Sequence, residues 1–154
     1  MTYIRLRNFS PILLRYSVAF LFLWFGLSQL MNAGMWVAWL PSWVDSLPVE
    51  PLTFIYMNGV LETVFGAFLA LGLFTRLSAL LLSLHLFGIA FSLGYNDIAV
   101  RDFCLALATM AVAFHGSDMW GYDNKFRKSW WGHTSVAKFL YLYEKGDVPP
   151  KESI

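Results

Sequence analysis

A single stretch decides the fold of this chain. Residues 52–95 read LTFIYMNGVLETVFGAFLALGLFTRLSALLLSLHLFGIAFSLGY. The stretch contains two apolar runs, 52–74 and 77–95, and only Thr75 and Arg76 separate them. Each run has the length of about 20 residues that a helix needs to cross the apolar core of a bilayer. The stretch therefore predicts two membrane-spanning helices joined by a tight turn.

Two further apolar runs lie on either side of this stretch, at residues 12–31 and 100–116. Helices satisfy their backbone hydrogen bonds internally, which the bilayer requires of a spanning segment. We expect an all-α fold, an integral membrane four-helix bundle. In this interpretation residues 1–154 form a single membrane domain, and residues 117–154 are its cytoplasmic tail.

The composition excludes several classes of protein. Of the 154 residues, 58% are hydrophobic and only 14% are charged. Soluble domains are about 25% charged, so this chain could not cover a soluble surface or remain disordered. A formal net charge of +1 is too small for a nucleic-acid-binding protein. Cys104 is the only cysteine, which excludes an internal disulfide and a CxxC redox pair.

Arginine and lysine residues predict the direction of the spans, because they concentrate in cytoplasmic loops. Arg76 occupies the central turn, and the tail at 117–154 holds most of the basic residues. The loops at 32–51 and 96–99 contain neither lysine nor arginine. We therefore expect both termini to be cytoplasmic, in a multi-pass protein of the cell (plasma or inner) membrane.

Two aromatic segments are predicted to lie at the membrane surface. Residues 35–47 repeat tryptophan and leucine at helical spacing, which indicates an interfacial element on the outer side. An ordinary aromatic belt is the simpler interpretation of this segment. Residues 126–143 combine aromatic residues with lysines, which predicts an amphipathic cytoplasmic C-terminal helix. Such a helix could rest on anionic lipid or dock a partner.

Each predicted span carries a stripe of small and polar residues at helical spacing. Membrane helices associate through such stripes. The four stripes, in chain order, are Arg15, Ala19, Phe22, Gly26, Gln29 and Ala33; Gly59, Glu62 and Gly66; Ser78, Leu81, His85, Gly88 and Ser92; and Asp102, Ala106, Thr109, Ala113 and Gly116. We expect a compact bundle with a shared polar interior.

Two ionisable residues are predicted near the middle of the bilayer. At about 1.5 Å per residue, Glu62 lies about 15 Å from the outer end of its span. His85 lies about 12 Å from the inner end of its own span. A charge at this depth costs at least a few kcal/mol unless it is neutral, paired or hydrated. The pair could share one proton in chemistry on a small ligand, or it could simply join two helices by a hydrogen bond.

Four more polar residues extend from this pair toward the outer face, which predicts an outward polar path. They are Gln29, Asn58, Arg101 and Asp102. Gln29 and Asn58 are also typical of polar contacts between helices. Arg101 and Asp102 fit a helix cap or a structural ion pair equally well. Arg15 is expected to extend its side chain to the cytoplasmic interface.

The histidines do not predict a haem. His115 and His85 differ in depth by about 10 Å, so one bis-histidine haem does not fit between them. No nucleotide-binding motif occurs, and no cysteine-based metal site can form. We expect no haem, flavin or metal ion within this chain.

The order of these residues resembles the DoxX family of small four-helix membrane proteins, which includes DoxD-like subunits. The resemblance covers about residues 12–116 and rests on five segments. They are Arg15 followed by Phe25-Gly26-Leu27-Ser28-Gln29-Leu30; Asn58-Gly59-x-x-Glu62 with Gly66; Leu71-Gly72-Leu73-Phe74-Thr75-Arg76; Ala79; and Arg101-Asp102. Many relatives have a lysine at the position of Gln29.

The resemblance implies a membrane subunit linked to redox chemistry, as in thiosulfate:quinone oxidoreductases with their second subunit. Our leading hypothesis is therefore a quinone-linked oxidoreductase subunit. It assigns catalytic roles to Glu62, His85 and Asp102, and it assigns binding roles to Arg15, Gln29, Asn58 and Arg101. The expected partners are the lipid bilayer, a redox subunit or other soluble partner, and a second copy of the chain. A non-catalytic anchor or assembly subunit and a small transporter or proton conduit are the alternatives.

Overall fold

The computed structural model describes residues 2–123, and every element in this part of the chain is helical. The elements, in chain order, are α1 (Thr2–Met31), α2 (Ala33–Trp36), the 3-10 helices η1 (Val37–Trp39) and η2 (Ser42–Ser46), α3 (Pro51–Leu71), α4 (Thr75–Ser92) and α5 (Asp97–His115). Four segments are long and apolar enough to cross a membrane: Phe9–Met31, Pro51–Leu71, Thr75–Ser92 and Asp97–His115. The structure thus confirms the all-α prediction and the four predicted spans.

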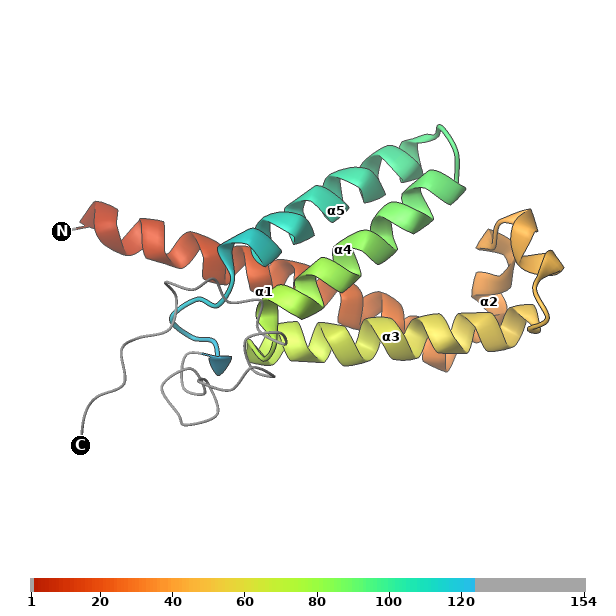
Figure 1. The fold of residues 1–154 in the computed structure, drawn as a ribbon, viewed down its shortest axis with the longest axis horizontal. Helices are drawn as coiled ribbons and strands as arrows, with labels where there is room; N and C mark the ends of the chain where they lie inside the picture. The colour runs from red at the N-terminus through yellow and green to blue at the C-terminus, as the bar shows by residue number, and fades with distance from the viewer. Residues whose placement is uncertain (1, 124–154) are drawn as a thin grey trace.

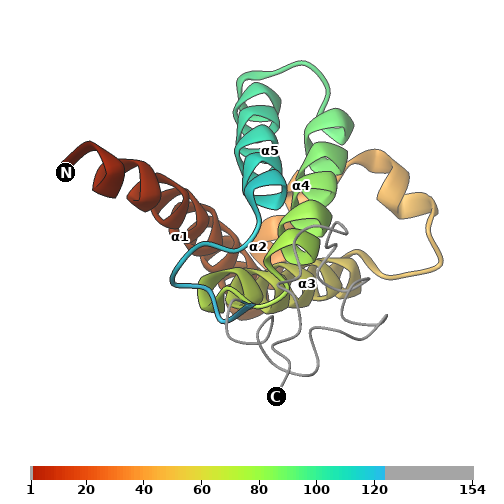
Figure 2. The ribbon, with the colours of Figure 1, turned by 60° about the vertical axis from the view of Figure 1, so that its left-hand side comes forward.

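The long helices form two pairs (Figures 1 and 2). Helix α1 lies along α3, and α4 lies along α5. The pairs meet near the turn between α3 and α4 and diverge toward the opposite end of the molecule. The segment from α2 to η2 lies at that opposite end (Figure 1).

Glycines permit the close approach of α1 and α3. A Cβ atom at Gly26 would lie 2.5 Å from Thr63 Oγ1, and one at Gly59 would lie 3.0 Å from the backbone oxygen of Gly26. A Cβ atom at Gly66 would lie 3.2 Å from the backbone nitrogen of Leu23. Small residues therefore hold the first pair together, as the stripes of the first two spans predicted.

Small residues also line the contact between α4 and α5. Ala79 and Ala106 are fully buried there. Ser83 Oγ donates a 2.9 Å hydrogen bond to the backbone oxygen of Ala106. The stripe of the fourth span is buried as predicted. The stripe of the third span is partly wrong, because Leu81 and Gly88 are exposed.

A tight turn and a distant carboxylate fix the junction of α3 and α4. Gly72 ends α3 at φ 67°, and Phe74 follows at φ 47°, in the region of φ that favours glycine. Asp123 Oδ1 and Oδ2 accept 2.8 Å hydrogen bonds from the backbone nitrogens of Phe74 and Thr75. Burial raises the pKa of the Asp123 carboxyl, and these backbone donors oppose the shift.

The expectation that Arg15 reaches the interface is wrong, because the side chain is fully buried. Its Nε donates to Asp118 Oδ2 at 2.6 Å, and its Nη2 donates to Asp118 Oδ1 at 3.2 Å. Its Nη1 donates to the backbone oxygens of Leu69 and Ala70 in the last turn of α3. Carbonyls at a helix C-terminus and a carboxylate thus replace water around the guanidinium.

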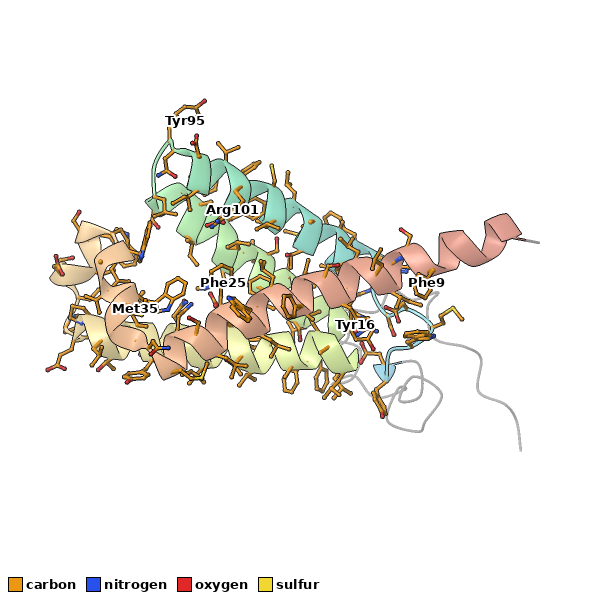
Figure 3. All side chains as sticks on the ribbon, turned by 180° about the vertical axis from the view of Figure 1, so that it is seen from behind. Phe9, Tyr16, Phe25, Met35, Tyr95 and Arg101 are labelled. Atoms are coloured by element: carbon orange, nitrogen blue, oxygen red, sulfur yellow. The ribbon has the colours of Figure 1, made fainter. Side chains whose placement is uncertain are left out.

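The start of the predicted tail packs on this same end of the bundle. The backbone nitrogen of Asp123 donates to the oxygen of Gly72 at 2.9 Å. The Trp120 ring lies 5.9 Å from Phe9 and 6.4 Å from Tyr16, centre to centre. Figure 3 shows Phe9 and Tyr16 at this end, whereas Met35 and Tyr95 lie at the other. The predicted amphipathic helix at 126–143 lies outside the described residues.

The last span begins earlier than predicted. Asn96 caps α5, and its side-chain oxygen accepts a 2.8 Å hydrogen bond from the backbone nitrogen of Ala99. Arg101 and Asp102 consequently lie in the second turn of the helix, so Asp102 is not a helix cap. The sequence analysis missed this start because Asn96 and Asp97 look like loop residues.

Candidate functional site

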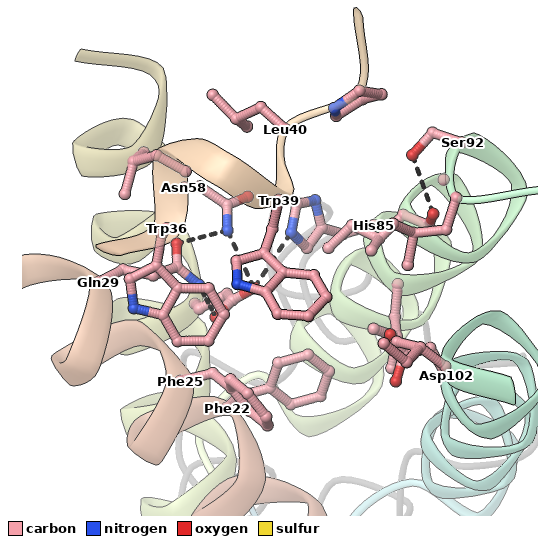
Figure 4. A pocket seen from close by; sticks show the side chains of 18 of the residues that line it. Phe22, Phe25, Gln29, Trp36, Trp39, Leu40, Asn58, His85, Ser92 and Asp102 are labelled. Atoms are coloured by element: carbon pink, nitrogen blue, oxygen red, sulfur yellow. Dashed lines mark hydrogen bonds and ion pairs between the residues drawn. The ribbon is translucent and has the colours of Figure 1, made fainter. Parts of the chain in front are cut away.

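A cavity of about 570 Å³ lies between the two helix pairs (Figure 4). Its size is in the range of cavities that hold small organic ligands. Aromatic and aliphatic side chains form most of its wall. The polar residues that line it are Gln29, Asn58, Glu62, His85, Ser92, Arg101 and Asp102.

Three of these polar residues form a closed hydrogen-bonded cluster. Glu62 Oε2 accepts from Gln29 Nε2 at 3.0 Å, and Glu62 Oε1 accepts from Asn58 Nδ2 at 3.1 Å. Asn58 Nδ2 also donates to Gln29 Oε1 at 2.7 Å. Asn58 and Glu62 are four residues apart and therefore share one face of α3, while Gln29 comes from α1. The cluster fixes the carboxylate of Glu62, which is only 3% exposed.

His85 approaches the cluster from α4, across the cavity. Its Nε2 lies 3.4 Å from Glu62 Oε1, yet it has no hydrogen-bond partner among residues 2–123. The His85 side chain is 22% exposed. A buried polar atom without a partner is uncommon and calls for an explanation. The Nε2 atom is itself buried beside the Glu62 carboxylate, so the imidazole meets a ligand through the part of its ring that faces the cavity.

Arg101 and Asp102 form a separate ion pair on α5. Arg101 Nη2 lies 2.9 Å from Asp102 Oδ1, and Arg101 Nε donates to the same oxygen at 2.9 Å. The Arg101 side chain is 56% exposed and the Asp102 side chain is 10% exposed. Both residues line the cavity, but no hydrogen bond joins them to Glu62 or His85 in the described part of the chain. The ion-pair interpretation of these residues is confirmed.

The cavity brings together six of the seven site residues that the sequence predicted. The exception is Arg15, which does not line the cavity and instead bonds Asp118. Glu62, His85, Asn58 and Gln29 form one group, and Arg101 and Asp102 form another. Any role of Arg15 in binding is therefore indirect.

The aromatic residues of the segment after α1 line the cavity, in addition to forming the outer aromatic element that their spacing predicted. Trp36, Trp39 and Trp43 all line it, and Figure 4 shows the rings of Trp36 and Trp39 beside the polar cluster. Trp36 Nε1 donates to Ser28 Oγ at 3.3 Å, and its ring lies edge-on to Phe25 at 5.6 Å. The helical spacing of these tryptophans directly after a span was the available signal.

No group of three or more histidine, cysteine, aspartate or glutamate side chains in residues 2–123 is placed to hold a metal ion. The site is therefore a cavity with one carboxylate–imidazole pair, one amide pair and one arginine–aspartate pair. These groups can form hydrogen bonds and can exchange protons.

The fold and the site define a small, four-span membrane protein with a polar cluster in an apolar cavity. The family model of DoxX matches residues 10–94, which is more than half of the chain. The protein therefore belongs to the DoxX family, and it is a multi-pass membrane protein. No curated protein and no solved structure matches this chain.

Proposed function

We propose that this protein is the quinone-handling membrane subunit of an oxidoreductase in the cell membrane, with both termini in the cytoplasm. The observation that carries the proposal is the contact of His85 Nε2 with the Glu62 carboxylate, 3.4 Å apart, on the wall of an aromatic-lined cavity. A quinone headgroup is a flat, apolar ring with two oxygens that accept hydrogen bonds. An apolar cavity with a few polar groups suits a ligand of this kind.

The proton chemistry follows from the groups on the cavity wall. Reduction of a quinone to a quinol takes up two electrons and two protons, one at each ring oxygen. His85 donates a hydrogen bond to the nearer ring oxygen, and Glu62 and His85 together exchange a proton with it. Gln29 and Asn58 hold the Glu62 carboxylate in position with hydrogen bonds of 3.0 and 3.1 Å. They are positioning residues in this scheme.

Arg101 and Asp102 form a second polar group on the cavity wall. We propose that they bind the other ring oxygen of the headgroup. The exposed guanidinium of Arg101 can donate a hydrogen bond to that oxygen without leaving Asp102, and the Asp102 carboxyl passes the second proton to it. The electrons come from a second subunit, which is the expected partner. The scheme places no haem, flavin or metal ion in this chain.

Binding of a short-tailed quinone to the purified protein tests this function. Glu62→Gln should weaken binding at least tenfold, which corresponds to about 1.4 kcal/mol. Ser83→Ala is the matched control, because Ser83 is buried and hydrogen-bonded but does not line the cavity. It should bind as the unmodified protein does. Equal binding by the unmodified protein and Glu62→Gln would contradict the assignment and favour an anchoring or assembly subunit.

A further inference from the structure

Gly88 is a glycine of the cavity wall that faces open space. It lines the cavity and is exposed, and Leu81, two turns earlier on the same face of α4, is exposed without lining the cavity. A Cβ atom built at Gly88 would meet no other atom within 4 Å. The residue therefore lies at the rim of the cavity, where the wall of α4 meets the surface that faces the bilayer.

The absence of a side chain at Gly88 does not serve helix packing. Gly26, Gly59 and Gly66 each face a neighbouring helix, where a Cβ atom would lie 2.5 to 3.2 Å from another atom. Glycine in a helix interior costs roughly 1 kcal/mol relative to alanine. At Gly88 no neighbouring atom excludes a side chain, so helix packing does not explain why a glycine stands there. What the glycine provides is open space at the cavity wall.

The surface beside Gly88 is apolar and continuous with the lipid-facing side of the helix. Leu84 lies one turn before Gly88, also lines the cavity and is 54% exposed. Phe91, three residues after Gly88, is 73% exposed. His85 lies on the other side of Gly88, with its imidazole directed to the polar cluster (Figure 4). A path over Gly88 thus joins the polar cluster to the bilayer.

The other sides of the cavity suit an apolar chain less well. The rim on α5 carries the charged side chain of Arg101, which is 56% exposed. The segment from Trp36 to Trp43 lines the cavity and lies at the end at which the helix pairs diverge (Figure 1). Burying an apolar chain against a charged group forfeits solvation of that group.

We propose that Gly88 forms one edge of a lateral opening in the cavity wall. The apolar tail of the bound ligand passes through this opening from the cavity into the bilayer. The ligand class is a membrane-dissolved molecule with a polar headgroup and a long hydrocarbon tail. This inference rests on the proposed function, because it places the headgroup at Glu62 and His85. It adds a second subsite that recognises the tail.

The test compares two ligands that share a headgroup, a quinone with an isoprenoid tail and the same quinone without one. Their dissociation constants are measured for the unmodified protein, Gly88→Ala and Gly88→Leu. Gly88→Leu should weaken binding of the tailed quinone at least tenfold and change binding of the tailless quinone less than twofold. Gly88→Ala should give a smaller change in the same direction.

Gly34→Leu is the matched control. A Cβ atom at Gly34 also meets nothing within 4 Å, but Gly34 does not line the cavity. This variant should bind both quinones as the unmodified protein does. Thermal unfolding of each variant checks that it remains folded, which is expected because neither glycine faces a neighbouring atom.

The outcomes separate the two proposals. If the unmodified protein binds neither quinone, the proposed function is wrong, and so is the proposed tail subsite. If it binds both and Gly88→Leu affects neither, only the tail subsite is wrong. An equal loss for both quinones in Gly88→Leu also overturns the tail subsite, because it shows that the substitution alters the headgroup site instead.

Discussion

Arg15 Nε lies 2.6 Å from Asp118 Oδ2, and this buried contact ties α1 to the segment that follows α5. Both side chains are almost completely buried, at 1% and 2% exposed. The same guanidinium also bonds the last turn of α3. Three parts of the chain therefore meet at one cation, on the end where the two helix pairs converge.

This contact predicts a large loss of stability when one partner is removed. Arg15→Met should destabilise the protein by roughly 3–5 kcal/mol, because the buried carboxylate of Asp118 loses the guanidinium beside it. Denaturant unfolding in detergent measures the effect. The double variant Arg15→Met/Asp118→Leu should recover much of the loss. A single variant as stable as the unmodified protein would contradict this role of the pair.

Asp123 predicts a second stability effect at the same end. Asp123→Asn keeps one acceptor oxygen but turns an amide group toward the second backbone donor. Loss of a hydrogen bond at a buried donor costs roughly 1–3 kcal/mol. We expect a loss in this range, measured by unfolding at neutral pH. Asp45→Asn is the control, because Asp45 is exposed.

The pH dependence of this effect has a defined sign. Burial raises the pKa of the folded Asp123 carboxyl above its ordinary 3.8. Between that value and the raised one, the folded state holds more protons than the unfolded state at this residue. The contribution of Asp123 to stability is therefore full below pH 3.8 and declines as the pH rises through the raised pKa. Asp123→Asn should remove this decline from the pH profile of unfolding.

The glycine contact between α1 and α3 predicts a third effect. Gly26→Val should destabilise the protein by roughly 1–3 kcal/mol, because the added side chain overlaps Thr63 and forces the helices apart. Gly34→Val, in open space, should change stability little. Equal effects of the two substitutions on thermal unfolding would show that the contact is looser than described.

Much of this fold was predictable from the sequence, because each span is long, apolar and bounded by polar residues. The polar group at Glu62 was also predictable, since Gln29, Asn58 and His85 lie at compatible depths and on compatible faces. The position of Arg15 was not. Its partners are a residue 103 positions away and the carbonyls of another helix, and neither appears in a local pattern.

The place of the tryptophans in the cavity wall was not specified by the sequence, for a similar reason. Amphipathic aromatic segments next to a span usually lie in the interface, so Trp36 and Trp39 suggested a membrane belt. Only the divergence of the two helix pairs creates a space that these rings can cover. The open rim at Gly88 likewise depends on how α4 sits against α3, which no stripe of residues specifies.

The most direct test of the central claim is infrared difference spectroscopy on reduction of a quinone bound to the purified protein. If Glu62 exchanges a proton with the headgroup, reduction should change a carboxyl band that disappears in Glu62→Gln. The same band should persist in Asp45→Asn, whose exposed carboxyl lies away from the cavity. A spectrum in which Glu62→Gln and the unmodified protein show identical carboxyl bands would contradict the account.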